Sequence, residues 1–170
     1  MKQEDKQTNY ELAEKLISEQ NFTAAVIIGA ITTLFAGAIY SIIVTKWDFS
    51  YGFVAAGIGI AVGASMQSLG RGIETKFAVL AASYTIAGCI LGKVFPAIVR
   101  LAREGATSPQ EVFQSNGISE LAGQFAFDFS FIELVFWLVG VWFAVFLVKR
   151  PLSRSERLAI GMHRLKEPHS

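Results

Sequence analysis

The fold of this chain is decided by residues 52–92, which read GFVAAGIGIAVGASMQSLGRGIETKFAVLAASYTIAGCILG. The stretch consists of two apolar segments joined by a short charged turn, Gly70–Lys76, and it contains eight of the chain's fifteen glycines. A helix of about 20 mostly apolar residues is long enough to cross the hydrocarbon core of a bilayer. We therefore interpret the stretch as a transmembrane helical hairpin.

Small residues recur four positions apart within this hairpin and in the apolar segment that precedes it. In lipid no hydrophobic force draws helices together, so close approach of backbones over small residues supplies much of the packing energy. We expect the glycine-rich hairpin to lie at the centre of a helix bundle. The residues expected at helix contacts are Gly29, Gly37, Ala55, Gly59, Gly63, Gly88 and Gly92.

The rest of the chain predicts an all-α membrane protein with four transmembrane helices. Of its 170 residues 52% are hydrophobic, and the mean hydropathy is +0.44. The fourth apolar stretch is rich in aromatic residues, so we expect it at the lipid-facing perimeter of the bundle. The first apolar stretch follows some twenty polar residues and is too long for a signal peptide. The four predicted spans cover about 22–45, 52–69, 77–99 and 129–148 of a membrane domain at 21–148.

Three segments lie outside the predicted spans. Residues 1–20 are expected to form an amphipathic helix, with a capping box at Thr8 and Glu11. The loop 100–127 has a strong helix start at Ser108-Pro109 and many apolar residues, which predicts short interfacial helices. The tail 149–170 has another capping box, at Ser153 and Glu156.

The tail helix is amphipathic and basic. Its charged face carries Arg154, Arg157, Arg164 and Lys166. On a helix tethered to the membrane, these side chains fit anionic lipid head groups better than nucleic acid. Alternatively, they only set the orientation of the chain.

An even number of spans puts both termini and the hairpin turn on the same side of the membrane. That side carries eleven basic residues: Lys2, Lys6, Lys15, Arg71, Lys76, Lys149, Arg150, Arg154, Arg157, Arg164 and Lys166. The other side carries three, Lys46, Arg100 and Arg103. Because basic residues concentrate in cytoplasmic segments, we expect both termini in the cytoplasm and the loop 100–127 outside it.

No residue pattern in the chain points to catalysis, a metal or a cofactor. The only histidines, His163 and His169, lie in the tail, and Cys89 is the single cysteine. The run Gly57-x-Gly59-x-x-x-Gly63 superficially resembles a dinucleotide-binding motif, but it lies inside an apolar span, where helix packing explains it better. We therefore expect no enzymatic activity, no cofactor and no metal.

Three motifs resemble a group of small bacterial multi-pass membrane proteins with about four helices. They are the turn Gly70-Arg71-Gly72, the helix motif Gly88-Cys89-Ile90-Leu91-Gly92, and the run 129–137, in which Glu133 precedes an aromatic pair. The resemblance covers about half of the chain and implies a bacterial inner-membrane protein, with no implied catalytic activity. The chain departs from the group at Lys93, where a neutral polar residue is expected, and in the lack of tyrosines at the end of the fourth span.

Two charged residues, Lys93 and Glu133, fall within predicted spans at similar depth. We expect them to pair, or else Lys93 extends to the membrane surface while Glu133 finds water or a hydroxyl group.

The sequence favours a non-enzymatic membrane protein that acts by helix–helix association, as a scaffold or accessory subunit with protein partners or copies of itself. The alternative is a small homo-oligomeric channel or transporter that uses these two charges, because intramembrane charge often marks a transport pathway.

Overall fold

A computed structural model describes residues 3–47, 52–104, 123 and 131–166 of the chain. Within these residues the structure is helical and has no strand. Its helices are α1 (Gln3–Ser18), α2 (Phe22–Trp47), α3 (Gly52–Gly70), α4 (Thr75–Glu104), α7 (Phe131–Val148) and α8 (Arg154–Lys166).

Four of these helices are long and apolar enough to cross a membrane, which confirms the prediction of four long apolar helices. The apolar segments are Phe22–Lys46, Phe53–Gly70, Thr75–Val99 and Phe131–Val148, each within two residues of the predicted bounds. α4 continues through Pro96 to Glu104 without a break. The chain therefore has the make-up of a multi-pass membrane protein.

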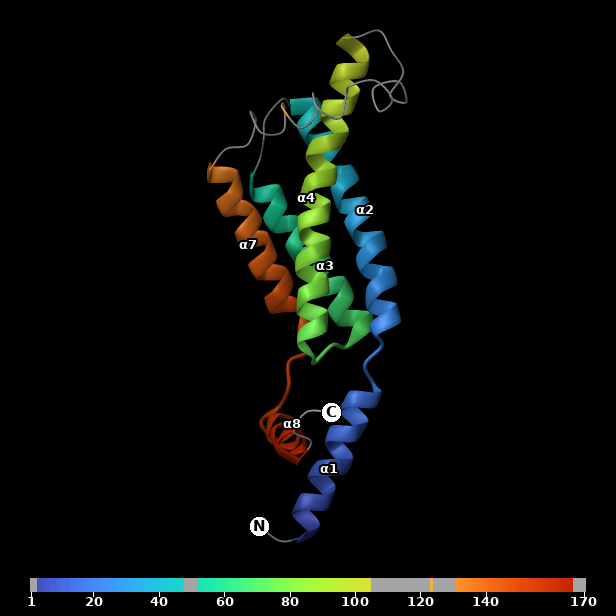
Figure 1. Ribbon diagram of the computed structural model, residues 1–170, viewed down its shortest axis with the longest axis vertical. Coiled ribbons are helices and arrows are strands. Elements are labelled where there is room, and N and C mark those ends of the chain that lie inside the picture. The colour runs from blue at the N-terminus through green and yellow to red at the C-terminus, as the bar shows by residue number, and fades with distance from the viewer. Residues whose placement is uncertain (1–2, 48–51, 105–122, 124–130, 167–170) are drawn as a thin grey trace.

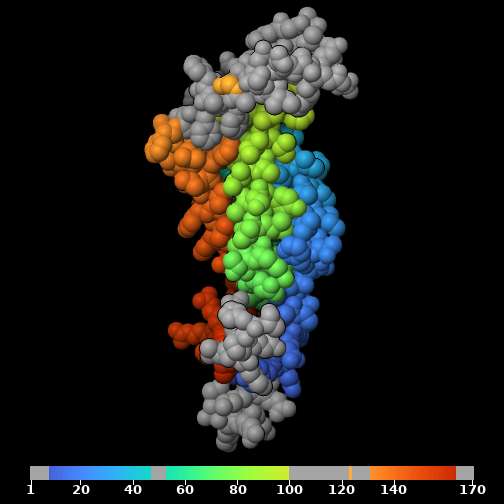
Figure 2. Space-filling view, viewed as in Figure 1, coloured from blue at the N-terminus to red at the C-terminus, as the bar shows by residue number. Residues whose placement is uncertain are grey.

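The four spanning helices stand at the corners of a bundle (Figure 1). α3 and α4 each pack against both α2 and α7, so that α2 and α7 occupy opposite corners. α4 lies between α7 and α2 on the face drawn in Figure 2. The two arms of the hairpin contact each other less than α3 contacts α7 and α4 contacts α2, so each arm packs mainly on a helix outside the hairpin.

The contact between α3 and α7 is a close approach of two backbones. A methyl group added at Gly59 would overlap the main chain of Gly140, and one added at Gly140 would overlap the carbonyl oxygen of Ala55. One turn further along, a methyl group at Gly63 would lie 2.9 Å from the carbonyl oxygen of Ala144. α7 exposes aromatic side chains such as Trp142 and Phe146 at the surface of the bundle, as expected, but Gly140 and Ala144 also form a small-residue face against α3.

The contact between α2 and α4 also uses glycines. A methyl group at Gly29 would meet the ring of Tyr84 at 2.6 Å. One at Gly37 would lie 3.2 Å from the carbonyl oxygen of Gly88. Gly88 itself faces a side chain of α3, since a methyl group there would lie 2.9 Å from Cγ2 of Ile58.

The bundle is filled inside and apolar outside. The largest fully buried side chains include Tyr40, Phe77 and Met66, whereas Leu34 and Phe35 on the outer face of α2 are 62% and 69% exposed. Large exposed apolar side chains at this density suit a surface that meets lipid rather than water.

The predictions for the segments outside the bundle had mixed outcomes. α1 begins at Gln3, so Thr8 lies inside the helix and the predicted capping box there was wrong. The box at the start of α8 is confirmed, because Ser153 N donates to Glu156 Oε2 at 2.6 Å and Glu156 N donates to Ser153 Oγ at 3.3 Å. The helix start at Ser108 and the expected interfacial helices lie outside the described residues.

The glycine contacts predict that a large side chain at Gly59 or Gly140 separates α3 from α7. We expect Gly59→Leu and Gly140→Leu each to destabilise the protein by about 3 kcal/mol or more, since the overlapping atoms are main-chain atoms that cannot rotate away. Thermal unfolding in mild detergent measures the effect.

Gly57→Leu is the matched control. Gly57 lies on the same helix with no atom within 4 Å of an added methyl group, so this variant should unfold no earlier than the wild type. Equal stability of the Gly57 and Gly59 variants would contradict the described contact.

Candidate functional site

The bundle interior contains a small polar cluster drawn from three helices. Lys93 of α4 and Glu133 of α7 form an ion pair, with side chains only 11% and 5% exposed. The hydroxyl of Tyr40, a fully buried residue of α2, donates to Glu133 Oε1 at 3.4 Å. The structure thus brings together the two charges that the sequence singled out, and adds a tyrosine that sequence reasoning missed.

Local structure explains how the three side chains meet. Glu133 lies in the first turn of α7, where the free backbone N–H groups and the helix dipole favour a negative charge. A methyl group at Gly92 would overlap the ring of Tyr40, so the glycine beside Lys93 gives the tyrosine room to reach Glu133. The cluster joins α2 and α7, which occupy opposite corners of the bundle and do not pack on each other.

This arrangement stabilises the bundle and keeps its interior electrically neutral. Burying a charge without a partner of opposite sign destabilises a protein. Here each residue of the pair is the partner of the other. Tyr40 adds a hydroxyl that bonds the same carboxylate.

The other buried hydroxyl groups bond to helix carbonyls. Thr85 Oγ1 donates to the carbonyl of Ala81 at 2.8 Å, and Thr33 Oγ1 donates to that of Tyr84 at 3.3 Å. Within the described part of the chain, no three His, Cys, Asp or Glu side chains gather in a group that could hold a metal ion.

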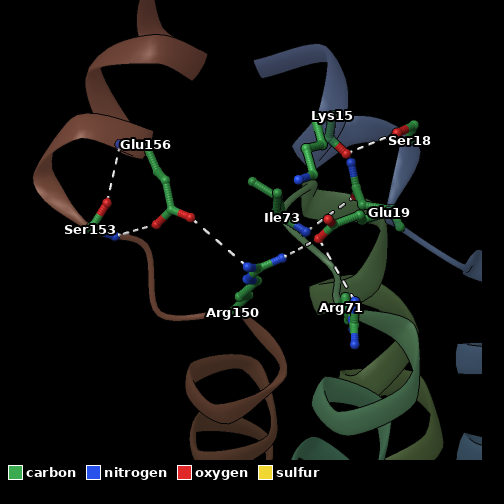
Figure 3. A network of polar contacts seen from close by, with 9 residues as sticks. Lys15, Ser18, Glu19, Arg71, Ile73, Arg150, Ser153 and Glu156 are labelled. Carbon is green, nitrogen blue, oxygen red and sulfur yellow. Dashed lines mark hydrogen bonds and ion pairs between the residues drawn. The ribbon is translucent and has the colours of Figure 1, made fainter. Parts of the chain in front are cut away.

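A second polar cluster, which we call the terminal network, lies at the end of the bundle nearest the two chain termini (Figure 3). Arg150 is at its centre: Nη1 donates to Glu19 Oε2 at 2.8 Å, and Nη2 lies 3.9 Å from Glu156 Oε1. Arg71 Nη1 lies 3.8 Å from the same oxygen of Glu19. The network therefore joins the residues after α1, the hairpin turn and the start of α8.

Backbone bonds fix the hairpin turn in this network. Asn21 N donates to the carbonyl of Gly70 at 3.0 Å, and Arg150 N donates to that of Gly72 at 3.1 Å. Arg71, between the two glycines, has a φ of 47°, a left-handed conformation that residues other than glycine adopt infrequently. The chain entering α2 and the chain leaving α7 are thus both attached to the turn between α3 and α4.

Electrostatics in the network favours ionised carboxylates. The hydrogen bond from Arg150 lowers the pKa of Glu19 from its ordinary value of 4.5, and the charge of Arg150 acts in the same direction. The pKa of Glu156 is lowered mainly by the backbone and side-chain hydrogen bonds of Ser153. Both carboxylates accordingly stay charged in the folded protein at neutral pH.

The predicted tail residues divide into two groups. Arg154 and Arg157 are exposed on α8, close to the terminal network. Arg164 and Lys166 belong to the same helix, but their side chains lie outside the described residues.

Sequence reasoning missed Gly140, Tyr40, Glu19 and the role of Arg150. For Gly140 a signal was present, since Gly140 and Ala144 have the four-residue spacing of small residues used for the other spans. For Glu19 and Arg150 no local signal exists, because the two residues are 131 positions apart and meet only in the folded chain.

The buried pair predicts non-additive effects of mutation. Lys93→Met and Glu133→Leu should each destabilise the protein by about 3–5 kcal/mol, because each leaves the other charge buried without its partner. The double variant should recover much of this loss. Thermal unfolding of all four proteins in detergent measures the coupling, and strictly additive effects would show that the two charges do not stabilise each other.

The lowered pKa of Glu19 predicts a pH dependence of α1 docking. The stabilising contribution of the Glu19 carboxylate should be fully present above its unfolded-state pKa of about 4.5. This contribution should be lost as the pH falls through the lower pKa of the folded state. We expect Glu19→Gln to weaken the protection of α1 amides against hydrogen exchange at pH 7, and the difference from wild type to shrink below pH 4.5.

Glu14→Gln serves as the control, since Glu14 is an exposed carboxylate on α1, the helix that Glu19 follows. It should leave the protection of α1 unchanged at every pH. Equal effects of the Glu14 and Glu19 substitutions would rule out a specific contribution of the Glu19–Arg150 bond.

No family model, curated protein or solved structure matches this chain. Its function must therefore be inferred from its own residues, and two features stand out from them. One is the buried cluster of Lys93, Glu133 and Tyr40, and the other is the terminal network around Arg150.

Proposed function

We propose that this chain is a bacterial inner-membrane protein without enzymatic activity, which acts by helix–helix association as a scaffold or accessory subunit of a membrane complex. The observation that carries the proposal is the pair α1 and α8, which lies beyond the ends of the spanning helices (Figure 1). We call this pair the terminal platform. It offers a partner a helical surface outside the lipid.

The terminal platform has an interior of its own. Ala13 and Leu16 of α1 are 0% and 3% exposed, and Ala159 of α8 is fully buried. The rings of Tyr10 and His163 lie 6.4 Å apart between the two helices. These contacts join the two ends of the chain into one unit.

The outer face of the platform retains apolar side chains. Leu158 is 66% exposed and Ile17 is 39% exposed. Exposed apolar residues on a helix pair outside the membrane fit a contact with another protein. The terminal network attaches the platform to the bundle through Arg150, so a partner bound there is held at a fixed position relative to the spans.

The distribution of basic residues supports a cytoplasmic position for the platform. The side with both termini and the hairpin turn carries eleven lysines and arginines against three on the other side, as enumerated above. The resemblance to small bacterial multi-pass proteins supports the bacterial inner membrane as the location. Partners would then be cytoplasmic proteins or cytoplasmic parts of other membrane proteins.

The second candidate function is a small homo-oligomeric channel or transporter. The intramembrane pair of Lys93 and Glu133 favours it, because charged groups within spans often belong to ion or proton pathways. Against a pathway through a single copy, the backbones of α3 and α7 meet directly at Gly59 and Gly140. A pathway would have to run between copies of the chain.

Affinity purification of the full chain from cross-linked native membranes tests the proposal. We expect the wild type to retain a protein partner in a fixed ratio and Leu158→Glu to lose it, because a carboxylate would be buried in the contact. Glu11→Ala, which changes an exposed polar residue of α1, should retain the partner.

Two outcomes would overturn the proposal. Recovery of the wild-type chain alone would exclude an accessory subunit. A ring of identical chains that passes ions in vesicles, with flux abolished by Lys93→Met, would establish the second candidate instead.

A further inference from the structure

A half-open pocket of about 450 Å³ lies where the ends of α3 and α7 meet α8. Its lining is apolar on one side and basic on the other. Trp142, Val145 and Phe146 of α7 form the apolar side, and Lys149, Arg150 and Arg157 form the basic side. Neither proposed function uses this pocket.

The apolar side belongs to the membrane-facing surface of the bundle. Trp142 and Phe146 are 60% and 66% exposed, and their rings stack with centroids 5.6 Å apart and an angle of 13°. They lie in the last two turns of α7, whose apolar segment ends at Val148. A tryptophan near the end of a span is typical of the level at which lipid head groups begin.

The basic side lies just past the end of the span. Among the ion pairs of the described residues, none includes Lys149 or Arg157. Both side chains are exposed, whereas Arg150 already bonds Glu19. Gln67 Nε2 donates to the carbonyl of Lys149 at 3.0 Å, so α3 fixes the backbone that presents the lysine.

We propose that this pocket binds one anionic glycerophospholipid. The phosphate and head group contact Lys149 and Arg157, and an acyl chain follows Trp142 and Phe146 toward the membrane interior. The order of the two sides along α7 matches such a lipid, with the apolar side at the depth of the acyl chains and the cations beyond the end of the span. A zwitterionic lipid such as phosphatidylcholine would place its own cationic group beside these two basic side chains. Repulsion between the like charges disfavours the binding of such a lipid.

The site narrows the expected contact of the basic tail with anionic lipid to a single position. It makes Arg157 a ligand and leaves Arg154, one turn earlier on α8, outside the pocket. The proposal does not depend on the scaffold function, because the pocket is formed entirely by this chain.

Native mass spectrometry of the full-length protein in a neutral detergent tests the site. The protein is titrated with dioleoyl phosphatidylglycerol, dioleoyl phosphatidylcholine and glycerol 3-phosphate in parallel. We expect one phosphatidylglycerol to bind with saturation, phosphatidylcholine to bind about tenfold more weakly, and glycerol 3-phosphate not to bind, because it lacks the acyl chain.

Substitutions then locate the lipid. Lys149→Gln and Arg157→Gln should each weaken binding of phosphatidylglycerol about fivefold, since each removes one basic residue from the head group. Arg154→Gln removes the same charge from the same helix outside the pocket and should change binding less than twofold. All three residues are exposed, and matching thermal unfolding midpoints establish that the variants fold.

Three results would overturn the proposal. Equal binding of the two phospholipids would exclude selection by charge. Equal losses in the Arg154 and Arg157 variants would show diffuse attraction to the whole tail. Binding of glycerol 3-phosphate comparable to that of the lipid would identify a phosphate site rather than a lipid site.

Discussion

The close approach of α3 and α7 at Gly59 and Gly140 is the constraint on which the rest of the structure depends. Within lipid the apolar surfaces of the helices gain nothing by leaving an apolar solvent, so direct packing must hold the bundle together. Once these two backbones touch, the position of α7 along α3 is fixed. That position brings Glu133 at one end of α7 beside Lys93, and Arg150 beyond the other end beside Glu19.

Between α2 and α4, Gly37 also faces a main-chain atom, but two other glycines face aromatic rings. Between α3 and α7 a glycine faces main-chain atoms, whereas on α2 Gly29 faces the ring of Tyr84, and on α4 Gly92 faces the ring of Tyr40. An aromatic ring fills the space left by the missing side chain, and its hydroxyl can then reach a polar group. Tyr84 bonds the carbonyl of Val26 in this way, and Tyr40 bonds Glu133. In this bundle the glycines therefore determine where Tyr40 and Tyr84 can make their hydrogen bonds.

The sequence predicted those features that depend on local composition. Four apolar stretches determined the four spans, and the spacing of Ser153 and Glu156 determined the start of α8, since both signals lie within a few residues of what they specify. The capping box at Thr8 shows the limit of such signals, because the residues before it, from Gln3 onward, are helical too. Similar depth also suggested that Lys93 and Glu133 could meet.

Features that depend on which helices pack against each other could not be predicted from the sequence. The hairpin arms are adjacent in the chain, yet each packs mainly on a helix from outside the hairpin, and no single segment specifies that choice. Gly140 was overlooked because the aromatic residues around it dominate the appearance of its span. The terminal network joins residues from three distant parts of the chain, so its members look like ordinary surface charges until the fold places them together.

The bond between Glu19 and Arg150 can form only late in the synthesis of the chain. Glu19 is synthesised 131 positions before Arg150, which follows α7. Until that span is synthesised and inserted, the hairpin turn lacks the bond from Arg150 to Gly72, and the glycine face of α3 lacks its cover. A growing chain that lacks α7 therefore has an α1 without its attachment through Arg150 and an open glycine face on α3.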